Sequence, residues 1–136
     1  ILATLTLDDP VFIETALPVT RRDVRSEVHV ASEALYLEGL ETNDPYLVGS
    51  VVASFAWDIR DAVGPERPLA AAFTAAQGLR SIPEQRDPEE LLFAPDEFVL
   101  LMVQALAGEA STLAAACAAL DTRFPHLEAS ECSSSD

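Results

Sequence analysis

The sequence contains no lysine, and this absence narrows the range of partners that the protein can have. All 8 basic residues are arginines, and 23 acidic residues outnumber them, which leaves a formal net charge of −15 at pH 7. A surface that binds nucleic acid needs a basic patch that displaces counterions, and an anionic membrane also attracts basic segments. We therefore expect neither nucleic acid nor membrane as a partner, whereas a basic protein fits this charge. The arginine-only, alanine-rich composition indicates a bacterial source.

Cysteine, glycine and long apolar runs are also scarce. Cys117 lies in an alanine-rich run and Cys132 in a serine-rich segment, a pattern typical of neither a disulfide framework nor a zinc site. We predict that Cys117 is a small buried apolar residue of a protein in the reducing cytoplasm. The 5 glycines are scattered singly, so no phosphate-binding loop is expected. No run approaches the ~20 apolar residues of a membrane span, and the sequence predicts no metal and no other cofactor.

What the sequence does contain is a succession of amphipathic segments with clear boundaries. The clearest begins with Asp44 as N-cap and Pro45 in the first turn, and it ends at Gly64, which are the usual start and stop signals of a helix. Its wide apolar stripe includes Phe55 and Ile59 and predicts a central, buried helix. The pattern predicts helices over residues 21–40, 45–63, 68–79, 88–93, 98–106 and 109–122.

The sequence thus predicts an all-α, single-domain bundle of five or six helices over residues 1–127. In its first 17 residues, apolar and polar side chains alternate from Thr4 to Asp8 and Asp9-Pro10 could start a helical turn, so we expect an extended or short-helical arm. The run from Phe98 to Leu106 is almost unbroken in its apolarity and predicts a fully buried helix. Residues 128–136 are rich in serine and are expected to form a flexible tail.

Two pairs of side chains have a spacing suited to acid–base chemistry. His29 and Glu33 lie four residues apart, so they share a helix face, and a carboxylate in that place can orient an imidazole as a general base. Asp58 and Asp61 lie three residues apart, so they share a helix face and could perform acid–base chemistry together. Charged residues at these spacings are more often a solvated helix face, so the sequence favours a protein that is not an enzyme.

Aromatic and sulfur-containing side chains on the predicted helices suggest an apolar pocket between them. Such residues also form ordinary cores, and the pattern alone does not separate the two roles. The candidates for lining a ligand pocket are Phe55, Trp57, Phe73, Phe93, Phe98 and Met102.

Alanine recurs along the last predicted helix, at residues 110, 114 and 118 and at residues 115 and 119. Small side chains allow another helix to approach closely, and together with the apolar arm they favour a two-fold homodimer. We therefore expect a small, acidic, helical binding or adaptor protein, homodimeric, that engages a basic protein partner or an apolar small molecule between its helices. The alternative is a small helical enzyme that uses His29 with Glu33, or Asp58 with Asp61.

Overall fold

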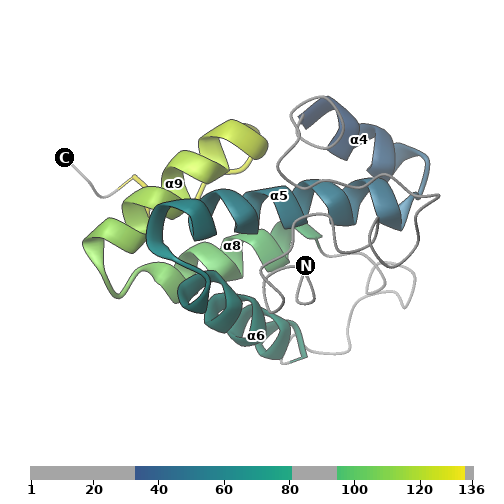
Figure 1. Ribbon diagram of the computed structural model, residues 1–136. Coiled ribbons are helices and arrows are strands. Elements are labelled where there is room, and N and C mark those ends of the chain that lie inside the picture. The colour runs from purple at the N-terminus through teal and green to yellow at the C-terminus, as the bar shows by residue number, and fades with distance from the viewer. Residues whose placement is uncertain (1–32, 81–94, 134–136) are drawn as a thin grey trace.

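The computed structural model describes residues 33–80 and 95–133, and within these ranges all regular structure is helical (Figure 1). The five helices are α4 (Glu33–Glu41), α5 (Pro45–Val63), α6 (Glu66–Arg80), α8 (Pro95–Leu106) and α9 (Ala110–Arg123). The predicted all-α class is confirmed. The N-terminal arm, the predicted helix 88–93 and the first part of the predicted helix 21–40 lie outside the described residues.

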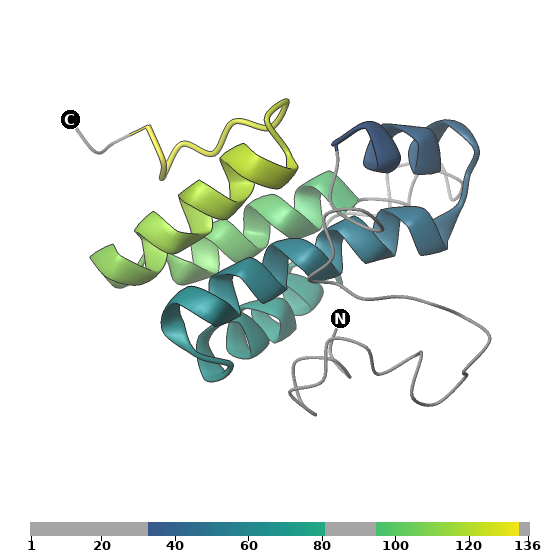
Figure 2. The ribbon, with the colours of Figure 1, turned by 45° about the horizontal axis from the view of Figure 1, so that its top comes forward.

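Helix α5 is the centre of the bundle and contacts each of the other four helices. Every residue from Val51 to Trp57 is buried, as is Ile59, so the prediction of a central helix is confirmed. Helix α9 runs beside α5 on one side, α6 and α8 pack closely on each other, and α4 lies over the first half of α5 (Figures 1 and 2).

Local signals explain where α5 begins and ends. The Asp44 carboxylate accepts hydrogen bonds from the backbone N–H groups of Tyr46 at 2.8 Å and Leu47 at 3.3 Å. At the other end Gly64 has a φ of 86°, a conformation that glycine adopts readily, and its N–H donates to the Arg60 carbonyl. These contacts supply partners for backbone groups that a helix end otherwise leaves without any.

The core is built mainly from α5, α8 and α9. Phe55, Val99, Met102 and Val103 are fully buried, and Phe124 packs its ring against Phe55 at a centroid distance of 5.8 Å. None of the helices in residues 33–80 and 95–123 is long and apolar enough to cross a membrane.

Helix α8 buries one face rather than its whole circumference, which corrects the prediction for Phe98–Leu106. Phe98, Leu100 and Leu101 are half-buried, and Gln104 and Ala105 are exposed. Within the described residues α8 contacts α5, α6 and α9, and its apolar run is wider than the face that is buried.

The two cysteines form a disulfide, which corrects the prediction of a buried, unpaired Cys117. The chain after α9 turns back along that helix (Figure 2), and this brings the Cα atoms of Cys117 and Cys132 to 5.6 Å from each other. Ala129 in the same segment is buried. The flexibility expected of residues 128–136 stays a prediction, but the structure attaches this segment to α9 as far as Cys132.

Candidate functional site

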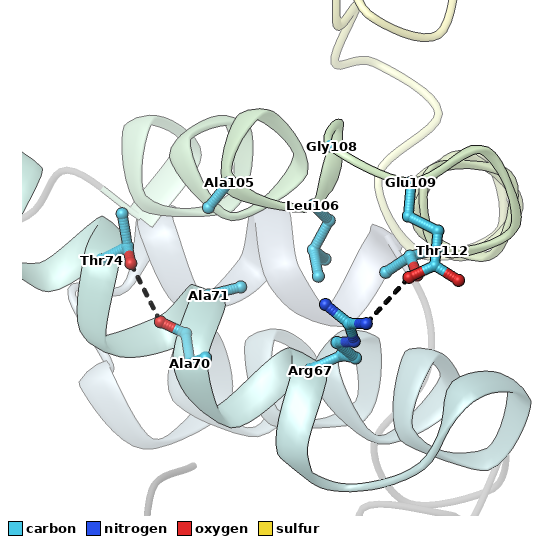
Figure 3. Close-up of a pocket in the computed structure, with 9 residues that line it drawn as sticks. All are labelled: Arg67, Ala70, Ala71, Thr74, Ala105, Leu106, Gly108, Glu109 and Thr112. Atoms are coloured by element: carbon cyan, nitrogen blue, oxygen red, sulfur yellow. Dashed lines mark hydrogen bonds and ion pairs between the residues drawn. The ribbon is translucent and has the colours of Figure 1, made fainter.

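A pocket of about 440 Å³ lies where α6, α8 and the start of α9 meet (Figure 3). Its floor is made of small or apolar side chains, of which Ala71 and Leu106 are buried. Ala70 and Ala71 of α6 and Ala105 of α8 carry a single methyl group each, so these two helices leave space between them at this point. This volume is in the range of pockets that hold small molecules.

Two charged side chains stand at the rim of the pocket. Arg67, in the first turn of α6, forms an ion pair with Glu109, the N-cap residue of α9, at 2.9 Å. The Ser111 hydroxyl also donates to Glu109, at 3.0 Å. Both members of the ion pair are more than half exposed, so the pair contributes little to stability and its partners are open to exchange.

Thr112 is the most informative residue of the pocket. It is only 3% exposed, it lines the cavity, and its hydroxyl makes no hydrogen bond with any of the described residues. By contrast, the Thr74 hydroxyl on the opposite wall donates to the Ala70 carbonyl at 3.1 Å (Figure 3). The Thr112 hydroxyl is not among the described side-chain atoms that are buried without a hydrogen-bond partner, so it is accessible from the pocket as a polar group to which a ligand can bond.

A second pocket, of about 370 Å³, lies between α6, α8 and the segment after α9. Leu100, Leu101 and Ala129 give it an apolar surface. The Cys117–Cys132 disulfide holds one of its walls, because residues 128–131 directly precede Cys132.

Four polar side chains from three distant segments meet at the other end of the bundle. His126 Nδ1 donates to Glu33 at 2.8 Å, and its Nε2 lies 3.9 Å from Asp96 Oδ1. The hydroxyl of the buried Tyr36 donates to Asp96. The Tyr36 and His126 rings stack at a centroid distance of 5.7 Å. We call Glu33, Tyr36, Asp96 and His126 the His126 cluster.

The pKa of Tyr36 is raised far above its ordinary value. Burial disfavours the charged phenolate, and both the hydrogen bond to Asp96 and the negative charge of that carboxylate act in the same direction. Tyr36 therefore stays a neutral hydrogen-bond donor and ties α4 to the start of α8.

Sequence reasoning found one member of the His126 cluster and missed its partner. Glu33 was expected to orient His29, which lies outside the described residues; the structure pairs Glu33 with His126 instead. His126 follows Pro125 near the end of the chain, and no local spacing connects it with Glu33. The pairing depends on how the end of α9 meets α4.

Asp58 and Asp61 have different partners, so the structure does not bring them together as a pair. Asp58 accepts two hydrogen bonds from Arg123, at 2.6 Å from Nε and 3.0 Å from Nη2, and Arg123 is buried. Asp61 forms an ion pair with Arg60 at 2.7 Å. The Arg60 guanidinium also lies over the Trp57 ring. In the described residues no group of three or more His, Cys, Asp or Glu is placed to hold a metal ion.

The aromatic candidates for a ligand pocket occupy several environments. Phe55, Trp57 and Met102 are buried in the core, Phe98 is half-buried against it, and Phe73 is 53% exposed. Phe93 lies outside the described residues. Both pockets given above are lined by other residues, which sequence reasoning missed because alanine and threonine carry no distinctive signal for binding.

Comparison of the chain with protein-family models, with curated proteins and with solved structures finds no match. The functional argument therefore depends on the geometry of the described residues.

Proposed function

We propose that this chain is a binding protein that holds a small, mainly apolar molecule in the pocket between α6, α8 and α9. The observation that supports the proposal is Thr112, a residue that is only 3% exposed and lines the cavity, where its hydroxyl is accessible to a ligand. The accessible lining of the pocket is about evenly polar and apolar, and small-molecule sites combine apolar surface with a few convergent polar groups.

Two contributions favour a ligand in this place. Apolar surface that a ligand covers contributes about 25 cal/mol per Å², and the alanines and Leu106 supply such surface. A ligand acceptor or hydroxyl that bonds to Thr112 contributes about 0.5–1.5 kcal/mol, since this bond replaces one to water. The rim pair of Arg67 and Glu109 then orients whatever charge the ligand carries.

The test is a screen of small amphipathic compounds by two-dimensional 1H–15N NMR of the labelled full chain. Binding should shift the amide signals of residues around Ala71 and Thr112. Thr112→Val removes the hydroxyl and keeps the shape, so we expect it to leave stability nearly unchanged while ligand affinity falls about tenfold, which is about 1.4 kcal/mol.

Filling the pocket gives an independent test with a matched control. Ala105→Trp places a large side chain at the mouth of the pocket and should abolish binding. Ala118→Trp, at an exposed alanine of α9 that does not line the pocket, should leave binding intact. If both tryptophan variants bind alike, or if Thr112→Val destabilises the protein, the proposed site is wrong.

Acid–base catalysis at the His126 cluster is the second candidate function. The Glu33 carboxylate lies 2.8 Å from His126 Nδ1, and a carboxylate in that place orients an imidazole for acid–base chemistry. This arrangement would serve an enzyme, and it replaces the predicted pairing of His29 with Glu33. Hydrolysis of a model ester that is lost in His126→Gln, and weakened in Glu33→Gln, would support this alternative.

Self-association remains a proposal that the exposed alanines of α9 support, and a basic protein partner remains one that the net charge of −15 supports. Ala110, Ala114 and Ala118 form an exposed stripe along α9, whereas Ala119 is buried. Light scattering at micromolar concentration should give the mass of a dimer. A monomer mass at moderate salt would reject the homodimer.

The disulfide bears on the compartment in which the protein acts. Bonds of this kind persist in oxidising compartments, so such a compartment matches the Cys117–Cys132 bond better than the reducing cytoplasm expected from the cysteine pattern. Alkylation of free thiols during cell lysis, followed by mass spectrometry, distinguishes the two.

A further inference from the structure

The first turn of α9 differs from that of α5 in a way that bears on the ligand. At α5 the Asp44 carboxylate accepts from the backbone N–H groups of the second and third residues, Tyr46 and Leu47. At α9 the N-cap residue is Glu109, and its side chain accepts no capping hydrogen bond from the backbone N–H groups of the first turn. The Glu109 carboxylate instead turns to Arg67 and the Ser111 hydroxyl.

The equivalent N–H groups of α9 belong to Ser111 and Thr112. Thr112 lines the pocket, and its unpartnered hydroxyl stands on the same turn. A helix N-terminus favours negative charge because its N–H groups point outward and the helix dipole is positive there. A ligand carboxylate in this part of the pocket would have the place at α9 that the Asp44 carboxylate has at α5.

Arg67 adds a full positive charge at the same rim. It comes from the first turn of α6, and its guanidinium lies 2.9 Å from Glu109. A carboxylate in this part of the pocket would lie close to the Arg67 guanidinium and to the first turns of α6 and α9, both of which favour negative charge.

Glu109 makes a simple anion a poor ligand. A lone carboxylate that takes Arg67 leaves Glu109 without its cation and places two negative charges side by side. The chain as a whole also carries a net charge of −15, which repels anions. A ligand with an ammonium group beside its carboxylate offers one partner to each member of the rim pair and carries no net charge.

We propose that the pocket binds a small zwitterion with an apolar body, of the class of apolar α-amino acids. The carboxylate lies at the first turn of α9 and Arg67, the ammonium group lies at Glu109, and the apolar side chain covers Ala71 and Leu106. This inference depends on the proposed binding function of the same pocket and names its ligand class.

Calorimetric titration of the full chain with three matched compounds tests this assignment. L-Phenylalanine has both charges, 3-phenylpropanoate lacks the ammonium group, and phenethylamine lacks the carboxylate. We expect L-phenylalanine to bind at least about tenfold more tightly than either singly charged analogue, since each charge-assisted hydrogen bond contributes on the order of a factor of ten.

Substitution of either rim residue should change which of the three compounds binds most tightly. Arg67→Gln should favour phenethylamine over the acid, and Glu109→Gln should favour 3-phenylpropanoate over the amine. Arg60→Gln removes an arginine that does not line the pocket and serves as the control, with the preference for the zwitterion unchanged.

The outcomes separate this inference from the proposed function. Equal binding of all three compounds that is lost in Ala105→Trp would overturn the zwitterion and leave the binding function standing. If other apolar compounds bind at this pocket and none of the three does, the zwitterion is likewise overturned and the binding function stands. No chemical-shift change at the pocket with any compound would overturn both.

Discussion

Breaking the disulfide between Cys117 and Cys132 should destabilise the protein by about 3 kcal/mol at 25 °C. The two cysteines are separated by 15 positions in the sequence, and a bond that closes a loop of this length removes a corresponding amount of entropy from the unfolded chain. The double variant Cys117→Ala/Cys132→Ala restores that entropy. Both residues are half-buried, so the loss of sulfur packing adds little.

Urea denaturation followed by far-UV circular dichroism measures this loss. The thermal midpoint should also fall by roughly 9–15 °C, as a domain of this size shifts by about 3–5 °C per kcal/mol. Ser133→Ala, at an exposed residue beside Cys132, is the matched control and should change neither quantity. Wild-type protein with its disulfide reduced should resemble the double variant.

Two results would refute this reasoning. Free thiols in the untreated wild-type protein would show that the bond is not formed in solution. A loss below about 1 kcal/mol with the thiols fully oxidised would show that the unfolded loop is already constrained, since the entropic contribution requires a free chain.

Three further predictions concern the core and the buried polar groups. Phe55→Ala should cost about 3–5 kcal/mol, because the ring is fully buried and leaves a cavity; a loss near zero in urea denaturation would place this face outside the core. Asp58→Asn should cost about 2 kcal/mol, since it leaves the buried Arg123 without its carboxylate while solvent reaches the half-exposed Asp58; an unchanged urea midpoint would count against a stabilising ion pair. Stability should fall as the pH rises above about 10, by up to about 1.4 kcal/mol per pH unit from Tyr36, because the raised pKa keeps the folded phenol protonated while the unfolded phenol ionises. Tyr36→Phe should remove this part of the slope, and an identical slope in the variant would contradict the assignment.

Helix class and several helix ends could be predicted because their signals are local. Asp44, Pro45 and Gly64 act on backbone groups within one turn, and the predicted helix 45–63 matches α5 at both ends. The burial of Phe55 and Ile59 was likewise evident from the width of one apolar stripe. Helix α6 begins at Glu66, two residues before the predicted start, because Pro68 fits anywhere in a first helical turn.

The candidate site depended on contacts between residues far apart in the chain. The pocket exists because alanines on α6 and α8 face each other next to the first turn of α9, and alanine at each place separately indicates nothing more than a good helix former. Thr112 became a candidate only when its burial and its missing partner were known.

The sequence by itself determined the helical class, the boundaries of the central helix and its buried stripe, since caps and periodicity act over a few residues. The tertiary structure alone decided the partners of the polar and sulfur-containing side chains. Arg123 meets Asp58 across 65 positions and His126 meets Glu33 across 93, and Cys132 returns to Cys117 only because the chain reverses after α9. Such pairings follow from the packing of whole helices, which the spacing of residues along one helix does not encode.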